Sequence, residues 1–276
     1  MDAVQNGRLD FLVKTLWEEI PGHKERAIFE NYHEKRRAFR KFMNIRMPGR
    51  ISEEFLEIQD AFLKEEAKEK GIVPITEILT VKEQFGSGTA FADKLSVWQG
   101  DITRLRADAI VNAANPQMLG CFIPCHGCID NVIHSSAGVQ LREECHEIMS
   151  RKRMQYGNAY QEPTGTAVIT GGYNLPAAHV IHTVGPVVSG GLTDSLRQDL
   201  RNCYRSILQC ALEKELKSIA FCCISTGEFH FPNGEAAAIA VDTVQEFLGE
   251  HGNEIERIIF NVFKDVDREL YYELLS

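Results

Sequence analysis

Apolar side chains in the first third of the chain recur every three or four residues, the spacing of one face of an amphipathic helix. The first such series ends at Pro21-Gly22, a pair that stops a helix. A second helix is predicted from about Lys24 to Met43. Ser52 and its neighbours resemble a capping box, which predicts a third helix ending near Gly71. The pattern therefore predicts a helical N-terminal region, in which we find no chemistry.

After Gly86-Ser87-Gly88 the pattern changes, and short apolar runs alternate with amphipathic helices. Such alternation is typical of a largely parallel sheet covered by helices, where ligands collect at the carboxyl ends of strands. The expected strands are Leu95–Gln99, Ala109–Ala113, Ala167–Gly171, His179–Val184, Ile219–Ile224 and Ile258–Phe263. The expected helices are Asn131–Ser150, Ser195–Glu215, Gly234–Glu250 and Asp265–Leu274. We predict a three-layer α/β/α fold with a mixed sheet over residues 93–276, preceded by a helical region over residues 1–92.

The charge of the chain is unevenly distributed. The 276 residues include 30 basic and 39 acidic ones, a net charge of −9. Residues 1–92 hold 15 basic and 16 acidic residues, so nearly all of the excess belongs to the second part. Proteins that bind nucleic acids or anionic membranes through their charge need a surplus of Lys and Arg. This chain has a surplus of acidic residues instead, so neither is an expected partner. A small anionic ligand held by main-chain amides is still compatible with this charge.

Two further features of the polar pattern bear on location and partners. The chain begins without a basic segment followed by an apolar one, and no apolar run approaches the ~20 residues that span a bilayer, so we expect a cytoplasmic protein. A basic stretch in the second helix is interpreted as a solvated helix face, with a partner-binding patch as the alternative. Its residues are Lys35, Arg36, Arg37, Arg40 and Lys41.

Three polar segments follow predicted strands, where a ligand site is expected. Gly100-Asp101-Ile102-Thr103 is by itself an ordinary turn. Asn112-Ala113-Ala114-Asn115 places two amides at a strand end, where they either form a turn or bind ribose hydroxyls. Ser225-Thr226-Gly227-Glu228-Phe229 lies between a strand and a helix, and amides in such a turn can hold a diphosphate without Lys or Arg.

Taken together and in this order, these motifs make residues 93–276 resemble the macrodomain family, which implies binding of ADP-ribose. The resemblance implies that Asp101 contacts the adenine amino group, with Ile102 beside it. It also implies that Asn261 approaches the proximal ribose and that Phe263 stacks on adenine. The amides of residues 225–229 are expected on the diphosphate, with Phe229 near the distal ribose. For both phenylalanines, a place in the hydrophobic core is the alternative.

The loop after Asn115 departs from common macrodomains, because soft metal ligands replace a run of glycines. Cys121, Cys125, His126 and Cys128 lie within eight residues, and thiols with an imidazole at this density suit Zn²⁺. Small buried hydrophobes or a redox pair are the alternatives. Cys203, Cys210, Cys222 and Cys223 are spaced as core residues of helices and strands.

This loop is similar to that of the zinc-containing macrodomains, whose Cys-x4-His-x-Cys pattern implies one Zn²⁺ held by Cys121, His126 and Cys128. Three protein ligands leave a fourth position open, as in catalytic sites, whereas a fourth ligand from Cys125 would close it. Asp130 follows two residues later, either as the cap of a helix or as a carboxylate that acts on the distal ribose or its attacking water. His134 either pairs with Asp130 or lies at the edge of the core.

The resemblance implies a zinc-dependent hydrolase that removes single ADP-ribose units from modified proteins, with Asn115 and Asp130 as catalytic residues. It further implies an acidic-residue ester as substrate, a lipoyl-carrier protein as acceptor and a sirtuin-type transferase as partner. The alternative is a module that binds ADP-ribose and uses zinc only as a brace. A hydrolase of other ADP-ribosyl esters, or an enzyme of RNA processing, is a third reading, because these motifs specify ADP-ribose and not the attached group.

Overall fold

The structure is a computed structural model that describes residues 3–22, 29 and 31–276. Its first part is a bundle of three helices, α1 (Ala3–Glu18), α2 (Tyr32–Ile45) and α3 (Glu53–Lys70), as the periodicity predicts. The expected beginning of the second helix at Lys24 lies outside the described residues, but α2 starts only at Tyr32 with the extended Asn31 as its cap, so the predicted helix is too long at this end. The bundle has an apolar core of its own, built from Leu9, Leu12, Val13, Leu16, Ala38, Phe39, Phe42, Met43, Phe55, Phe62 and Leu63.

The predicted capping box at Ser52 is wrong. The Ser52 hydroxyl does accept a hydrogen bond from the amide of Phe55, so it caps α3. A capping box also needs a carboxylate or amide side chain at that third position, and Phe55 has none to return the bond. The complete motif occurs instead at Thr80 and Glu83, which open the short helix α4 (Val81–Phe85).

A six-stranded mixed sheet forms the centre of the molecule, in the order β2-β8-β7-β4-β6-β5. All neighbouring pairs are parallel except β5 with β6. The strands are β2 (Leu95–Gln99), β4 (Ala109–Ala114), β5 (Ala167–Gly171), β6 (His179–Val184), β7 (Ser218–Phe221) and β8 (Arg257–Val262). The central strands are buried almost throughout, because helices cover both faces.

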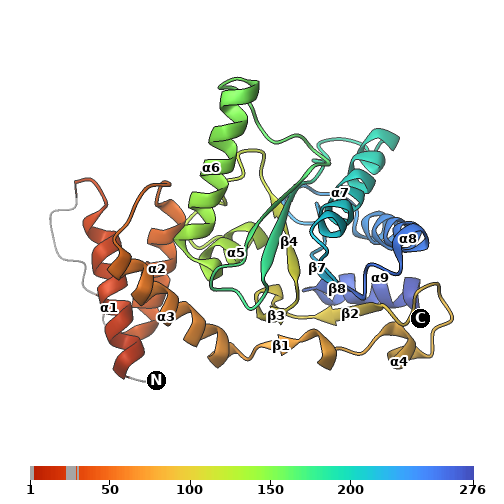
Figure 1. Cartoon of the computed structure of the whole chain (residues 1–276), viewed down its shortest axis with the longest axis horizontal. Helices are drawn as coiled ribbons and strands as arrows, with labels where there is room; N and C mark the ends of the chain where they lie inside the picture. Colours follow the sequence, from red (N-terminus) through yellow and green to blue (C-terminus); the bar gives the residue numbers. More distant parts are fainter. Residues whose placement is uncertain (1–2, 23–28, 30) are drawn as a thin grey trace.

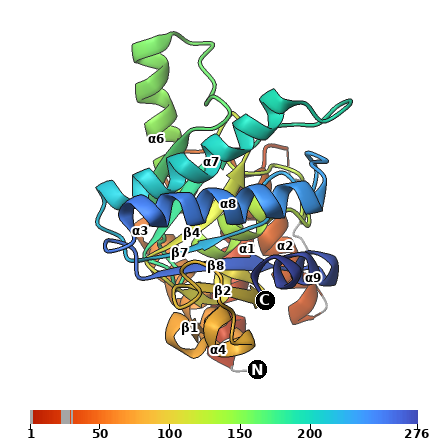
Figure 2. The ribbon, with the colours of Figure 1, turned by 90° about the vertical axis from the view of Figure 1, so that its right-hand side faces the viewer.

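Helices pack on both faces of this sheet and complete the predicted three layers (Figure 1). One face carries α7 (Asp194–Glu213), α8 (Asn233–His251) and α9 (Asp265–Leu275), which Figure 2 shows in front of the strands. The other carries α5 (Ile129–Ala137) and α6 (Val139–Tyr156), and the bundle α1–α3 lies beyond them.

The prediction of one helix over Asn131–Ser150 is wrong, because α5 and α6 are separate helices. Gly138 lies between them with φ +102°, a conformation that interrupts the helix. The amide of Val139, which begins α6, donates to Oε1 of Gln59 on α3. The break therefore creates a helix N-terminus to which the bundle is tied.

Sequence reasoning assigned no elements to the segment that joins the bundle to the sheet. In this segment the short strand β1 (Val73–Pro74) is followed by the 3₁₀ turn η1 (Ile75–Glu77) and by α4. Strand β1 pairs with β3 (Leu105–Arg106), which follows β2 and a second 3₁₀ turn, η2 (Ile102–Arg104). Ile78 and Val81 belong to the same apolar core as the sheet strands. Two-residue strands and single turns are too short to produce a periodic pattern. Among the described residues, no helix has the length and apolar character needed to cross a membrane.

Candidate functional site

A cleft of about 950 Å³ opens along the edge of the sheet where the parallel strands β2, β4, β7 and β8 end. This is the edge at which α/β sheets bind ligands, because loops and helix N-termini meet there. The cleft brings together most candidate site residues of the sequence: Asp101, Ile102, Asn115, Cys121, His126, Cys128, Asp130, Ser225, Thr226, Gly227, Glu228, Phe229, Asn261 and Phe263. Asn112, Cys125 and His134 do not line it, and the fully buried Asn112 cannot bind a ribose hydroxyl directly as expected.

One end of the cleft is formed by the turn after β2 and the end of β8. Asp101 caps η2, with Oδ1 accepting from the amide and the hydroxyl of Thr103. The Asn261 side chain is buried and donates to the carbonyls of Trp98 and Gly100, so it fixes this turn. Phe263 is 76% exposed, which excludes its alternative place in the hydrophobic core and leaves an aromatic face at the cleft.

The end of β4 and the beginning of α5 place a carboxylate in the floor of the cleft. Asp130 is 5% exposed, and its Oδ1 accepts a hydrogen bond of 2.8 Å from Nδ2 of Asn112. Nδ2 of Asn115 donates to Oδ2 at 3.4 Å and to the carbonyl of Gly120 at 3.1 Å. Burial raises the pKa of Asp130 to about 6, against the opposite effect of the Asn112 hydrogen bond.

The alternative role of Asp130 as a helix cap is wrong. Helix α5 begins at Ile129, and its cap is Cys128, whose Sγ accepts from the amide of Asn131 at 3.5 Å. Asp130 is therefore already in the first turn, where its side chain turns toward β4. His134 lies one turn later with Nε2 3.5 Å from Oδ1 of Asp130, and burial holds the pKa of its ring well below the usual value.

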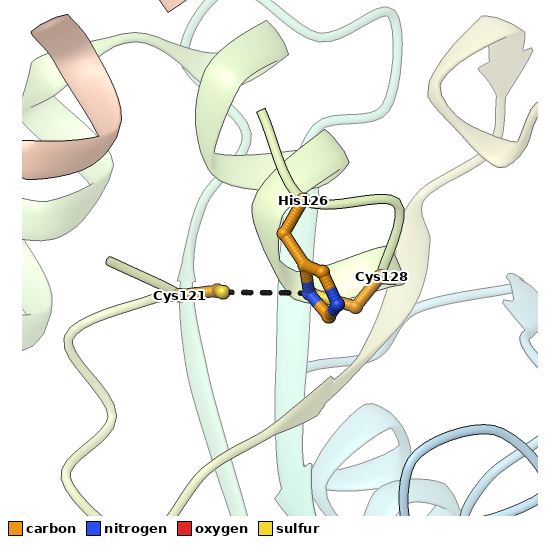
Figure 3. Close-up of side chains that lie close together, drawn as sticks. All are labelled: Cys121, His126 and Cys128. Atoms are coloured by element: carbon orange, nitrogen blue, oxygen red, sulfur yellow. Dashed lines mark hydrogen bonds between the residues drawn. The ribbon is translucent and has the colours of Figure 1, made fainter. Parts of the chain in front are cut away.

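Three soft ligands gather on the loop between β4 and α5. One side-chain ligand atom from each of Cys121, His126 and Cys128 lies within 4.8 Å of the others (Figure 3). Cys121 Sγ and His126 Nδ1 are 3.7 Å apart, close to the about 3.6 Å between S and N ligands at a tetrahedral Zn²⁺. Burial raises the pKa of the Cys128 thiol in the metal-free site, and the neighbouring Cys121 raises it further. The donor set and its spacing therefore fit a metal ion.

A second group, formed by His134, Cys145 and His182, is buried beneath the site. Nδ1 of His182 is 3.0 Å from Nδ2 of Asn112, which can only donate there, so Nε2 carries the ring proton and faces the hydroxyl of Thr170 at 2.9 Å. A protonated Nε2 is not a metal ligand. This group instead supports Asn112 and, through it, Asp130.

The thiol of Cys125 is directed away from the three ligands. Cys125 has φ +54°, and its amide donates to Oδ1 of Asn44 on α2 at 2.8 Å. Its Sγ lies 3.5 Å from the carbonyl of Arg37, on the same helix. Cys125 is therefore oriented toward α2 and does not join the ligand group in the structure.

The turn after β7 is built to present main-chain amides. Ser225 has φ +65°, and its carbonyl accepts from the amide of Phe231, while the carbonyl of Gly227 accepts from that of His230. Within the described chain, the amides of Gly227, Glu228 and Phe229 have no hydrogen-bond acceptor, whereas the amide of Thr226 donates to the carbonyl of Cys223 at 3.5 Å. The expectation of available amides over residues 225–229 is therefore only partly correct. Successive free N–H groups of this kind form a concave anion site. Phe229 is half-buried but belongs to none of the apolar cores of the described residues, so its alternative place in the hydrophobic core is wrong.

The interpretation of the basic stretch on α2 as a solvated face is only partly correct. Arg37 and Lys41 are exposed, whereas Arg36 and Arg40 line the cleft. The spacing of Arg36 and Arg40 places them on one helix face, a signal that was available in the sequence. Lys70, Lys264 and Asp267 also line the cleft and were not anticipated, because single charged residues carry no pattern.

Known proteins that resemble this chain agree with these features. A family model described as "Macro domain" matches residues 111–240. A "Protein-ADP-ribose hydrolase" from Treponema medium is 46% identical over 272 residues, which is 99% of either chain. Another protein of that name, from Staphylococcus aureus (strain MRSA252), is 42% identical over 270 residues, which is 98% of this chain and 95% of the relative. The crystal structure of a Trypanosoma brucei macrodomain in complex with ADP-ribose aligns with a TM-score of 0.63 at 30% identity, over 85% of this chain and 94% of that one. With this fold, this cleft and these relatives, the chain belongs to the macro domain family.

Proposed function

We propose that this protein is a zinc-dependent hydrolase that removes single ADP-ribose units from modified proteins. The observation that carries the proposal is the sharing of one cleft by three kinds of group: the three metal-ligating side chains, the free amides after β7, and the buried Asp130 with Asn115. Relatives named protein-ADP-ribose hydrolase, which align over almost the whole chain, support the same reaction.

Each end of the cleft has a part in binding. The amides of residues 227–229 hold the diphosphate, since free N–H groups and the helix behind them supply partial positive charge in an otherwise acidic chain. Phe263 offers its exposed ring to adenine, and Asp101 and Ile102 border the base. Asn261 supports this end through the turn that it fixes.

The reacting end lies between Asn115, Asp130 and the ligand loop. Asn115 orients the distal ribose, and Asp130 holds the attacking water and accepts its proton, with Asn112 fixing the carboxylate. Cys121, His126 and Cys128 would hold Zn²⁺, which when bound would supply Lewis-acid chemistry at this end of the cleft. The orientation of Cys125 toward α2 supports an open fourth position.

The proposal also covers the protein that carries the ADP-ribose and the cellular compartment in which the reaction takes place. The resemblance to zinc-containing macrodomains implies an ester on an acidic side chain of a lipoyl-carrier protein, modified by a sirtuin-type transferase. None of the eight cysteines forms a disulfide, which supports a cytoplasmic location with a reducing environment.

The test measures release of labelled ADP-ribose from a mono-ADP-ribosylated protein. We expect release by the native protein, loss on chelation, and recovery when zinc is restored. Cys121→Ser and Cys128→Ser should lose both zinc and release, whereas the matched control Cys125→Ser should keep both. Binding of free ADP-ribose without release would reject the hydrolase in favour of a binding module. Equal zinc loss in all three variants would mean that Cys125 is a fourth ligand.

A further inference from the structure

Hydrogen bonds cross from helix α2 of the N-terminal bundle to the loop that holds the metal-ligating side chains. The guanidinium of Arg40 donates to Oδ1 of Asn131 from Nε at 3.1 Å and from Nη2 at 2.8 Å. Nη2 also donates to the main-chain carbonyl of His126 at 2.7 Å. One arginine side chain therefore holds both a ligand residue and the first turn of α5.

Asn44, one helical turn further along α2, makes a second connection. Its side chain is 1% exposed, and Oδ1 accepts from the amide of Cys125 at 2.8 Å. Its Nδ2 donates to the hydroxyl of Ser135 on α5 at 3.0 Å. Both hydrogen-bonding ends of Asn44 are thus used to fix α5 and the loop residue immediately before His126.

Asn131 carries this support from Arg40 to the other two ligand residues. Its Nδ2 donates to the carbonyls of Ile123 at 2.9 Å and Cys121 at 3.4 Å, and its amide donates to Sγ of Cys128 at 3.5 Å. The buried Asn131 therefore contacts two of the three ligand residues directly and shares its Oδ1 with the arginine that holds the third.

We propose that Arg40 and Asn44 are positioning residues of the metal site, which hold the ligand loop in its binding conformation and thereby set the affinity for zinc. The proposal rests on the zinc binding proposed above. The ligand loop, residues 120–128, contains Gly120, Pro124 and Gly127 and no helix or strand of its own. Such a segment must be ordered before three ligands can meet, and support from neighbouring side chains removes that cost from metal binding.

The decisive comparison uses two arginines of the same helix. Arg40→Met keeps the aliphatic stem and removes the guanidinium, whereas Arg37→Met removes the same charge from an exposed side chain and leaves the Arg37 carbonyl in place. Zinc dissociation constants of the full-length proteins are measured by competition with a chromogenic chelator. Loss of groups that orient metal ligands typically costs about 10- to 100-fold in affinity, and we expect that loss for Arg40→Met and none for Arg37→Met.

Further variants separate positioning from folding. Arg40→Lys should recover part of the zinc affinity, because an ammonium can reach one acceptor but not form a fork. Asn44→Ala should also weaken zinc binding, and the melting temperature of each variant, measured with the metal chelated, reports its effect on the fold. The visible spectrum of the Co²⁺-substituted proteins should change for Arg40→Met and stay the same for Arg37→Met.

The outcomes distinguish this inference from the proposed function. A native protein that binds no zinc would reject both. Zinc affinity equal to the native value in Arg40→Met and Asn44→Ala would overturn the positioning role alone, as would equal weakening by Arg37→Met. A lower melting temperature with unchanged zinc affinity would reduce these contacts to ordinary packing between the bundle and α5.

Discussion

Two loops at the same edge of the sheet are stabilised in opposite ways. The ligand loop after β4 has no helix or strand of its own, and side chains of other elements, Arg40 and Asn44 on α2 and Asn131 on α5, hold it in place. The diphosphate loop after β7, residues 225–229, is held by its own main chain and by the amide of Val188, which donates to the carbonyl of Phe229.

The difference follows from what each loop is expected to bind. A cation needs side-chain ligands that converge on one point, and a loop that presents side chains inward must be supported from outside. An anion can be held by amides, and a turn that presents amides fixes itself through its carbonyls. Metal binding by the ligand loop should therefore be sensitive to substitutions on α2, a helix that is distant in sequence. Ligand binding by the diphosphate loop should respond mainly to changes in backbone geometry.

The largest effect on the diphosphate loop is expected from Gly185→Val at the end of β6. An added Cβ would lie 2.1 Å from Oγ of Ser225 and 3.0 Å from Cγ2 of Ile224, so the loop has to move. Overpacking of this kind costs about 1–3 kcal/mol. If binding has to return the displaced loop to its native position, the same free energy predicts about a 5- to 160-fold loss in affinity for free ADP-ribose. Isothermal titration calorimetry measures the loss.

Gly190→Val is the matched control for this substitution. An added Cβ at the exposed Gly190 meets no atom within 4 Å, so native affinity for ADP-ribose is expected. The two loops meet where Nε2 of His126 lies 3.6 Å from Oε1 of Glu228, whose side chain is 70% exposed. Zinc affinity should nevertheless stay close to native in both glycine variants, because α2 supplies the hydrogen bonds that hold the ligand loop. Loss of zinc affinity in Gly185→Val would contradict the independence of the two loops.

A smaller effect, on stability, is expected from the ion pair that anchors α2 within the bundle. Arg36 donates from Nη2 to Oε2 of Glu66 on α3 at 2.8 Å, and despite the opposing effect of burial this contact lowers the pKa of Glu66 to about 2 from 4.5. A carboxyl whose pKa is depressed by folding stabilises the protein above its unfolded pKa, and this contribution disappears as the pH falls from about 5 toward 2. Allowing for partial solvent screening, Glu66→Gln should cost about 1–3 kcal/mol at pH 7, a few degrees of melting temperature.

Thermal unfolding at pH 7 and at pH 3 tests this expectation. The difference between native protein and Glu66→Gln should shrink at the lower pH, where native Glu66 has lost part of its contribution. Glu65→Gln is the control, because Glu65 is more exposed and, among the described residues, pairs only with Lys68 on its own helix. Equal destabilisation by both substitutions would show that the buried Arg36–Glu66 pair contributes no more to stability than the exposed pair.

The smallest effect is expected from removing a hydroxyl from the diphosphate loop. The Thr226 hydroxyl donates to the carbonyl of Cys223 at 3.1 Å within the same turn. If amides bind the diphosphate, Thr226→Ala should change ADP-ribose affinity by less than about threefold, well under 1 kcal/mol. A loss of tenfold or more in the same calorimetric measurement would show that side chains, and not the main chain, dominate this loop.

Much of the sheet and the cleft could be predicted from the sequence, since both depend on local patterns. Strands β2, β5 and β6 have the predicted bounds, because each is a short apolar run between polar turns. Helices α7, α8 and α9 lie within two residues of the prediction for the same reason. Most candidate site residues lie in one cleft because motifs at the carboxyl ends of parallel strands share one edge of the sheet.

What could not be predicted depends on contacts between distant segments. The apolar pattern of α5 continues past Gly138 into α6, and a single glycine inside such a pattern does not by itself show whether the helix ends there; the contact with Gln59 of α3 is not visible in the sequence. Arg40 stands among basic residues that favour a solvated face, and only its packing against α5 reveals the acceptors of its guanidinium. A one-dimensional pattern reports how polar a position is, but not which partner satisfies it.

The buried Arg142 on α6 shows what it would take to transplant the ligand loop into another protein. Its guanidinium donates to the carbonyls of Met43, Asn44 and Arg46 at the end of α2, and to that of Leu119 just before the loop. A graft of residues 120–128 alone into a macrodomain without such a bundle would carry the ligands and leave behind the framework that aligns them. The segments needed for a functional graft are therefore not contiguous in sequence. A designer would have to transfer the loop, α2 and Arg142 together.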